Sequence, residues 1–584
     1  MLDTAYRRAL AAWTAPRSYL TATLLLSAWI ALFGNIALWT KLLGLARQGS
    51  IPHQTALTLA AILLASAAIT AVLLALLAWP RVFKPAAVVL LLVTATVQHM
   101  MLAYGTVIDQ GMVRNVLQTN FTELRDQVSP GLFVQWLLVA GVPSLWLLPR
   151  RLIASGGWRR LMANGMTVGV SLAVASGGIL SIYTTLAPLV RNHMELRFML
   201  NPTVPVLSTL ATAGKALRGE RSKALVGITA GAALGPQYAA GGAPPLLVLV
   251  VGETARADHF ALNGYGRDTT PRLAAKDIVS FNQVRSCGTS TLASLPCMFS
   301  SIGKAGYESQ KAEHENLLDV LQAAGLAVLW LDNQAGCKGV CARVPNASTA
   351  DPYPPADALR AQLCADGDCL DRLMLAGLDA RIAALPAERR RRGVVLVMHQ
   401  MGSHGPAYHR RSAADTKAFG PECRTTELAQ CPVAAVVDAF DNSIRETDRF
   451  LSDVIDWLGT QQKTYAPGML YVSDHGESLG EFGLYLHGVP YAFAPDAQKH
   501  VPMVAWLGRA LGERSATDTA CLHKHRADPL THDNLYPTVL GLLDVQTPTY
   551  RIAQDAFTPC RNGLPGETPD VAGRVPLRAV RAAS

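Results

Sequence analysis

The chain has 584 residues, half of them hydrophobic, and a formal net charge of +9. A chain of this length is too long to fold around a single hydrophobic core. Its composition also changes along the sequence: long apolar runs dominate the first 185 residues, and mixed polar sequence with short apolar runs follows. Part of the positive charge lies in short loops between the long runs. It therefore gives no support for nucleic-acid binding and fits contact with anionic lipid instead.

Five apolar runs are long enough to cross a hydrocarbon core of roughly 30 Å as helices: 19–40, 56–79, 85–104, 131–149 and 162–184. Basic residues precede the first run and fill the loops after the second and fourth: Arg7, Arg8, Arg17, Arg81, Lys84, Arg150, Arg151, Arg159 and Arg160. The opposite loops carry fewer: Lys41, Arg47, Arg114 and Arg125. This bias predicts a cytoplasmic N terminus and an extracytoplasmic C-terminal part. The first run lacks a small-residue cleavage site, so we expect no cleaved signal peptide.

Residues 106–129 are too polar to cross a membrane and too apolar for a free loop, which predicts an interfacial helix. Asn115, Thr119 and Glu123 recur every four residues and would share one helical face. A solvated surface face explains this pattern equally well. After the fifth run we expect a connecting helix over 204–218 and a Gly/Ala/Pro-rich linker over 231–245.

These divisions predict a transmembrane domain over 1–185, a connecting segment over 186–245, a catalytic domain over 246–565 and a polar tail over 566–584. All ten cysteines follow the fifth run, which indicates an oxidising compartment. Neighbours in sequence suggest the pairs Cys287 with Cys297, Cys337 with Cys341, Cys364 with Cys369 and Cys423 with Cys431, leaving Cys521 and Cys560. The alternative is a zinc site built from two of these neighbouring pairs, in 337–341 and 364–369.

Short β-rich runs alternate with helical patterns from residue 246 onward, which is typical of an α/β domain with a mainly parallel sheet. We expect strands over 246–251, 327–331, 394–398 and 469–472, and helices over 315–324, 370–384 and 433–458. Polar residues follow the four strands: Glu253, Asp332 and Asn333, His399 through His404, and Asp474 and His475. Open α/β sheets bind ligands at that edge.

Glu253, Asp474 and His475 offer two carboxylates and an imidazole, a set suited to zinc or manganese with one position left open. The segment 286–297 offers hydroxyls at 289, 290 and 291, where a glycine turn enters a predicted helix. A helix start can hold a phosphate, and a metal can make a threonine oxygen nucleophilic. The combination suits phosphoryl transfer through a phospho-threonine, although local sequence does not rank the three hydroxyls. An ordinary capped helix beside a disulfide is the structural alternative.

Five segments occur with the order and spacing of a known family: Val-Gly-Glu253-Thr-Ala-Arg, Ser-Cys-Gly-Thr-Ser-Thr291 through Pro-Cys-Met-Phe-Ser, Cys-Lys338-Gly-Val, His399-Gln-Met-Gly-Ser-His404-Gly-Pro, and Ser-Asp474-His475-Gly-Glu-Ser-Leu-Gly-Glu. Over nearly its whole length the chain resembles the lipid A phosphoethanolamine transferases, including the colistin-resistance enzymes. The resemblance implies a five-helix transmembrane domain followed by an α/β domain of alkaline-phosphatase/sulfatase type, with helices on both faces of its sheet.

Carried over by position, the resemblance implies one catalytic Zn²⁺, and a second possible one, with the catalytic ion held by Glu253, Thr291, Asp474 and His475. It makes Thr291 the nucleophile. It implies contacts with substrate or a second zinc for Lys338, His404 and His487, and with substrate for Asn115, Thr119 and Glu123. His399 stays open between a structural and a supporting role. Without the resemblance, Lys338 would be read as a surface lysine and His487 as a loop histidine.

The implied reaction moves phosphoethanolamine from phosphatidylethanolamine to Thr291 and then to a phosphate of lipid A, which would confer resistance to polymyxin and cationic peptides. We expect a monomeric, multi-pass protein of the bacterial inner membrane with its catalytic domain in the periplasm. The alternatives are another acceptor (a core sugar or a glycoprotein), a glycerol-phosphate donor, or a phosphodiesterase or sulfatase. The nucleophile loop lacks the Cys/Ser-x-Pro-x-Arg run of sulfatases. A scaffold without catalysis would lack ligands, and all four are present.

Overall fold

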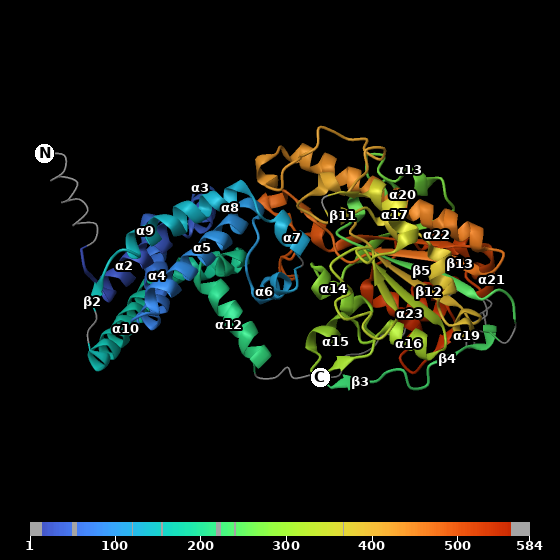
Figure 1. Ribbon diagram of the computed structural model, residues 1–584, viewed down its shortest axis with the longest axis horizontal. Helices are drawn as coiled ribbons and strands as arrows, with labels where there is room; N and C mark the ends of the chain where they lie inside the picture. The colour runs from blue at the N-terminus through green and yellow to red at the C-terminus, as the bar shows by residue number, and fades with distance from the viewer. Residues whose placement is uncertain are drawn as a thin grey trace.

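The computed structural model describes residues 15–49, 55–119, 121–153, 156–217, 224–238, 241–365 and 367–561. A bundle of long helices lies beside an α/β domain, and two short helices, α6 (Gln110–Leu117) and α7 (Phe121–Asp126), lie between them (Figure 1). Arg7, Arg8 and the polar tail expected after residue 566 are outside the described residues.

Four helical runs in the described part of the chain are long and apolar enough to cross a membrane: α4 (Thr55–Leu76), α5 (Phe83–Tyr104), the continuous run Pro130–Leu147, and α10 (Gly157–Ser181). The run Pro130–Leu147 contains α8 (Pro130–Gln135), a π-helical stretch (Trp136–Gly141) and α9 (Val142–Leu147). The first expected span is bent rather than straight. Its parts, α2 (Tyr19–Phe33) and α3 (Ile36–Arg47), meet at 51° and make a fifth span only as a pair.

Side chains from distant parts of the chain satisfy the backbone at this bend. Gln98 accepts a hydrogen bond from the Ile36 N–H at 2.8 Å and donates one to the Phe33 carbonyl at 2.9 Å. Asn35 donates to the Asn201 carbonyl at 2.7 Å, and the Asn201 N–H donates back to the Asn35 side chain at 2.9 Å. An interrupted helix is tolerated at membrane depth only when its exposed backbone groups find such partners.

The expected single helix over 106–129 is wrong, because two short helices occupy this segment. The Asn115 carbonyl accepts the N–H of Gln118 at 3.0 Å and the hydroxyl of Thr119 at 2.9 Å. A side-chain hydroxyl that bonds to the backbone in this way competes with the helical ladder. Asn115, Thr119 and Glu123 therefore do not lie on one face of a continuous helix.

The connecting helix is present as α12 (Thr203–Leu217), but part of the expected linker belongs to the α/β domain. Strand β4 (Ala233–Leu234) pairs antiparallel with β18 (Val545–Gln546). The Gly235 N–H donates to the Asp544 carbonyl at 2.7 Å. Upstream, β3 (Leu225–Val226) pairs in parallel with β7 (Glu313–His314). The glycine- and alanine-rich composition of 231–245 gave no sign of these pairings.

An eight-stranded sheet forms the centre of the α/β domain. Its order is β17 (Leu530–Thr531), β6 (Val279–Arg285), β16 (His500–Leu507), β13 (Ala466–Ser473), β5 (Pro245–Gly252), β12 (Val394–His399), β8 (Ala327–Asp332) and β9 (Asn346–Ser348). Strand β16 runs antiparallel to both neighbours, and the other pairings in this sheet are parallel. All four expected strands and the mainly parallel sheet are confirmed.

Both faces of the sheet are covered by helices. On β5, Leu247 and Leu249 belong to a buried cluster with α16 (Leu317–Ala323) and α23 (Leu535–Leu542), whereas Val248 and Val250 face a second cluster with α20 (Val433–Gln461). Burial on both faces explains why this strand is apolar throughout. The expected helices over 315–324 and 433–458 are confirmed. The one over 370–384 is divided into a 3₁₀ turn (Asp371–Leu375) and α18 (Leu378–Ala383) by Gly377, at φ +64°.

Buried polar contacts join the membrane-proximal helices to the α/β domain. Asp126, at the end of α7, lies 3.0 Å from Arg410 and 3.5 Å from Arg411, and its side chain is 3% exposed. Arg411 also pairs with Asp368 at 2.9 Å. Nearby, the Tyr104 hydroxyl donates to a backbone carbonyl in the loop before α20. These contacts hold the α/β domain against the membrane-proximal helices.

Asp126→Asn is expected to weaken the contact between α7 and the α/β domain and to lower the stability of the folded protein by about 2 kcal/mol. The reason is that it leaves the buried Arg411 with one carboxylate partner instead of two. Hydrogen–deuterium exchange in α7 and around residues 405–412 should become faster. The control is Asp415→Asn, which removes a carboxylate that is 62% exposed and pairs with Arg449. Equal exchange in both variants would show that the Asp126 ion pairs do not hold the domains together.

Candidate active site

Three potential metal ligands meet where adjacent parallel strands end. Glu253 follows β5, and Asp474 and His475 follow the neighbouring β13. All three are buried, and their ligand atoms lie within 4.8 Å of one another. The His475 Nε2 is 3.3 Å from Glu253 Oε1 and 3.4 Å from Asp474 Oδ2. The three residues predicted as ligands are thus brought together at one point.

Thr291 is the first residue of α14 (Thr291–Met298) and faces this group. Its hydroxyl donates to Glu253 Oε2 at 3.1 Å and lies 3.5 Å from His475 Nε2. The other two hydroxyls of the loop turn elsewhere. Thr289 donates to the backbone of Val489, and Ser290 donates to the Asn115 side chain at 3.4 Å. Of the three hydroxyls, which local sequence could not distinguish, only that of Thr291 contacts the candidate ligands Glu253 and His475.

The donor set fits a divalent cation. Glu253 Oε1 and Asp474 Oδ2 are buried and accept no hydrogen bond from any described residue. Burial lowers the pKa of His475, but the adjacent carboxylates of Asp474 and Glu253 outweigh it and raise that pKa. Buried anionic oxygens without partners are costly. Two carboxylates, an imidazole and a hydroxyl are ligands that zinc accepts in tetrahedral sites.

Two further histidines extend the site. The His487 ring centroid lies 4.4 Å from that of His475 and 5.3 Å from that of His404. His404 is buried, and its Nδ1 has no hydrogen-bond partner among the described residues. His487 Nδ1 is 3.2 Å from the buried carboxylate of Glu477, a neighbour that we did not predict. Both predicted histidines therefore lie beside the Glu253–Asp474–His475 group.

Lys338 and Glu253 are both electrostatic neighbours of Glu123. The Lys338 ammonium donates to the Ala335 carbonyl at 2.9 Å, from a residue in the left-handed region at φ +48°. Burial raises the pKa of Glu123, Lys338 lowers it and Glu253 raises it further, so both residues lie within electrostatic reach of Glu123. Thr119 contacts the Asn115 backbone, and no described contact joins it to the ligands.

Gln334 is a site residue that the sequence reasoning missed. Its amide donates to Glu253 Oε2 at 3.1 Å, so it fixes the carboxylate that also accepts from Thr291. The signal was present, since Gln334 directly follows the Asp332-Asn333 pair at the end of β8. His399 contacts Asp332 at 3.0 Å through Nδ1, which gives it a structural partner at the same sheet edge.

Both parts of the chain match known protein families. Residues 66–217 match the family Phosphoethanolamine transferase EptA/EptB, and residues 245–545 match the Sulfatase family. The phosphoethanolamine transferase EptA of Escherichia coli strain K12 is 35% identical over 557 residues, which cover 94% of this chain and 98% of that protein. The chain belongs to the phosphoethanolamine transferase family.

Other members of the family are similarly close. The phosphatidylethanolamine transferase Mcr-1 of Escherichia coli is 37% identical over 499 residues, covering 84% of this chain and 88% of Mcr-1. The solved structure of the integral membrane protein EptA from Neisseria meningitidis superimposes with a TM-score of 0.86 at 32% identity, covering 94% of this chain and 99% of that chain. The helical membrane part and the sulfatase-type α/β part thus occur together in a solved phosphoethanolamine transferase.

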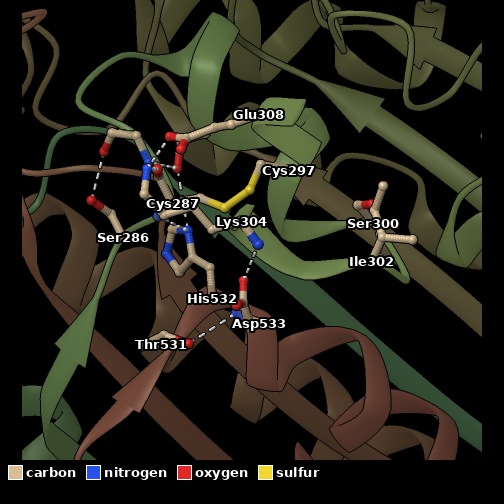
Figure 2. The surroundings of a disulfide bond; sticks show 12 residues. Ser286, Cys287, Cys297, Ser300, Ile302, Lys304, Glu308, Thr531, His532 and Asp533 are labelled. Carbon is tan, nitrogen blue, oxygen red and sulfur yellow. Dashed lines mark hydrogen bonds and ion pairs between the residues drawn. A yellow bond between two sulfur atoms is a disulfide. The ribbon is translucent and has the colours of Figure 1, made fainter. Parts of the chain in front are cut away.

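In this member of the family, a disulfide and a histidine brace the loop that carries Thr291 (Figure 2). Cys287 is bonded to Cys297, and Lys304 donates to the Cys287 carbonyl. The Cys287 N–H donates to His532 Nδ1 at 3.1 Å, and His532 Nε2 lies 2.9 Å from the Ser473 carbonyl. These bonds assign the proton to Nε2, and burial lowers the pKa of His532 to about 4, so the ring is neutral. His532 thus links the loop before Thr291 to Ser473, the last residue of β13, which directly precedes Asp474.

His532→Phe is expected to lower the transfer rate by about 10- to 100-fold, because small displacements of a nucleophile from its ligands are costly. The metal content should be retained, since His532 is not among the proposed ligands. His523→Phe is the matched control, because His523 is exposed in the same region. A change in KM alone, with kcat intact, would contradict the positioning role.

The ten cysteines form the five disulfides suggested by their spacing, including Cys521 with Cys560. The described residues contain no free cysteine. The alternative zinc site in 337–341 and 364–369 is therefore wrong, because its four sulfur atoms are bonded to one another in pairs.

Proposed function

We propose that this protein transfers phosphoethanolamine from phosphatidylethanolamine to a phosphate group of lipid A. One observation carries the proposal: the Thr291 hydroxyl contacts a buried Glu253–Asp474–His475 ligand set on the side of the α/β domain that meets the membrane-proximal helix α6. The names of the E. coli EptA and Mcr-1 relatives support phosphoethanolamine as the transferred group. A nucleophile beside membrane helices suits two lipid substrates.

The reaction proceeds in two displacements. The Thr291 oxygen attacks the phosphorus of the donor, the bond to the glycerol oxygen breaks, and diacylglycerol leaves with the threonine proton. An oxygen of the lipid A phosphate then attacks the same phosphorus, and Thr291 leaves and regains a proton. The free N–H groups at the start of α14 and the charge of Lys338 would stabilise the transferred phosphoryl group.

Zn²⁺ held by Glu253, Asp474, His475 and Thr291 would lower the pKa of the threonine hydroxyl and neutralise charge on the phosphoryl oxygens. Gln334 orients Glu253 through its 3.1 Å hydrogen bond. His404 and His487 would bind phosphate oxygens or a second zinc ion. Ser290 donates to Asn115 at 3.4 Å, which places α6 beside the nucleophile, where it would contact a bound lipid substrate.

The proposed location is the bacterial inner membrane, with a monomeric protein and its α/β domain in the periplasm. The five disulfides support an oxidising compartment. The basic loops at the opposite end of the bundle support a cytoplasmic N terminus. In this arrangement the site meets phospholipid and newly made lipid A at the outer leaflet.

Mass spectrometry of lipid A tests the proposal directly. Lipid A from cells that express the protein should gain one phosphoethanolamine per modified phosphate, and cells without it should not. An unchanged lipid A with a modified core sugar or glycoprotein would identify the other acceptors. Release of free phosphoethanolamine with no modified acceptor would indicate a hydrolase and overturn the proposal.

A further inference from the structure

The strand β2 (Leu152–Ile153) and the helix α10 lie at the end of the bundle away from the α/β domain (Figure 1), and an arginine in α10 is buried there. Arg160, in the first turn of α10, is 3% exposed. Its guanidinium carbon lies 4.1 Å above the ring centroid of Tyr19, and its Nη1 has no hydrogen-bond partner among the described residues. A buried guanidinium without an anionic partner is unfavourable, and stacking on one aromatic ring offsets only part of that cost.

Arg160 lines a cavity of about 290 Å³ between α2, α4 and α10. The wall is partly polar, with Ser18, Thr23, Asn164 and Thr167 beside apolar surface. A phosphate group with the adjoining glycerol is of this size and character. The unpartnered Nη1 therefore belongs to a built site that offers a charged donor, polar walls and space.

No carboxylate among the described residues of the helix bundle neutralises this arginine. The sequence contains no Asp or Glu over residues 15–104 or 129–181. Positive charge accumulates around the cavity instead. The paired strands β1 (Arg17–Ser18) and β2 (Leu152–Ile153) border it, and Arg151 and the exposed Arg159 are sequence neighbours of β2 and of Arg160. The described residues of the bundle therefore supply no anion for Arg160. A headgroup that also carries an ammonium would be repelled by these arginines.

We propose that this cavity binds the phosphate of an anionic phospholipid in the leaflet opposite the catalytic domain. An arginine fork matches phosphate oxygens, and basic pockets between membrane helices are typical sites for anionic headgroups. The lipid chains would lie along the exposed apolar faces of α2 and α10. This site lies apart from the proposed transfer reaction and does not depend on it.

Native mass spectrometry of the full-length protein, delipidated in detergent and titrated with phosphatidylglycerol, tests the site. We expect the unaltered protein to retain phosphatidylglycerol. Binding should be at least tenfold weaker in Arg160→Met and should change less than twofold in Arg159→Met. Phosphatidylcholine should bind at least tenfold more weakly than phosphatidylglycerol. Equal loss in both arginine variants, or equal binding of both lipids, would overturn the proposal.

Two further measurements separate the remaining explanations. Ala163→Phe keeps Arg160 but fills part of the cavity, and it should also weaken phosphatidylglycerol binding at least tenfold; unchanged binding would place the lipid elsewhere. Inorganic phosphate should not displace phosphatidylglycerol at millimolar concentration, and displacement would identify a free-anion site instead. Phosphatidylglycerol should raise the Tm of the unaltered protein and of Arg159→Met, but not that of the two cavity variants.

Discussion

Thr291→Ala is expected to reduce phosphoethanolamine transfer by at least about 10³-fold, because the variant lacks the oxygen that attacks the donor. The substitution removes only a few atoms from a buried position, so the fold should be retained. The protein alone, incubated with phosphatidylethanolamine, should carry a phosphoethanolamine adduct on Thr291 that mass spectrometry locates. Full activity without an adduct in Thr291→Ala would disprove the assignment of the nucleophile.

Thr289→Ala is the matched control for this experiment. Thr289 lies two residues earlier in the same loop, but its hydroxyl donates to the Val489 carbonyl and not to the ligand set. We expect Thr289→Ala to retain the adduct on Thr291 and most of the activity. Thr291→Ser should keep partial activity, since it supplies a hydroxyl at the same position.

Asp474→Asn is expected to weaken zinc binding by more than about 100-fold. Loss of a residue that only orients a metal ligand lowers metal affinity by about 10- to 100-fold, and loss of a ligand itself should lower it further. Asp474 Oδ1 accepts from the backbone N–H groups of Thr254 and His475, but the buried Oδ2 accepts no hydrogen bond from any described residue and lies 3.4 Å from His475 Nε2. Metal analysis of the purified variant should show less than one zinc per chain, and transfer activity should fall with it.

Asp456→Asn serves as the control, since that carboxylate is 62% exposed and pairs with Lys276 far from the site. Chelation of the unaltered protein should abolish activity, and added zinc should restore it. If Asp474→Asn retained full zinc occupancy, Asp474 would not be a ligand.

The strands and the clustering of Glu253, Asp474 and His475 could be predicted from sequence because each has a local cause. A strand buried on both faces, such as β5, must be a continuous apolar run, and the carboxyl ends of parallel strands lie at one edge. Polar residues such as Glu253 and Asp474 that directly follow such runs are therefore neighbours in space. Disulfides between cysteines a few residues apart were predictable for a similar reason.

The features that the sequence did not reveal depend on contacts between distant residues. The bend between α2 and α3 is supported by Gln98 and Asn201, which lie 62 and 166 residues from their partners at the bend. His532 reaches the Thr291 loop across 245 residues. Such contacts cannot be predicted from the periodicity or composition of a short stretch of sequence.

The pairing of β3 and β4 with strands far along the chain fixes where this protein could be recombined with its relatives. A chimera that joins its α/β domain to a foreign membrane helix bundle should cross over before Leu225 rather than within 231–245. The later cut would import foreign residues at Ala233 and Leu234, opposite Val545 and Gln546. Exchange of whole functional units within the family is therefore best made upstream of these two short strands.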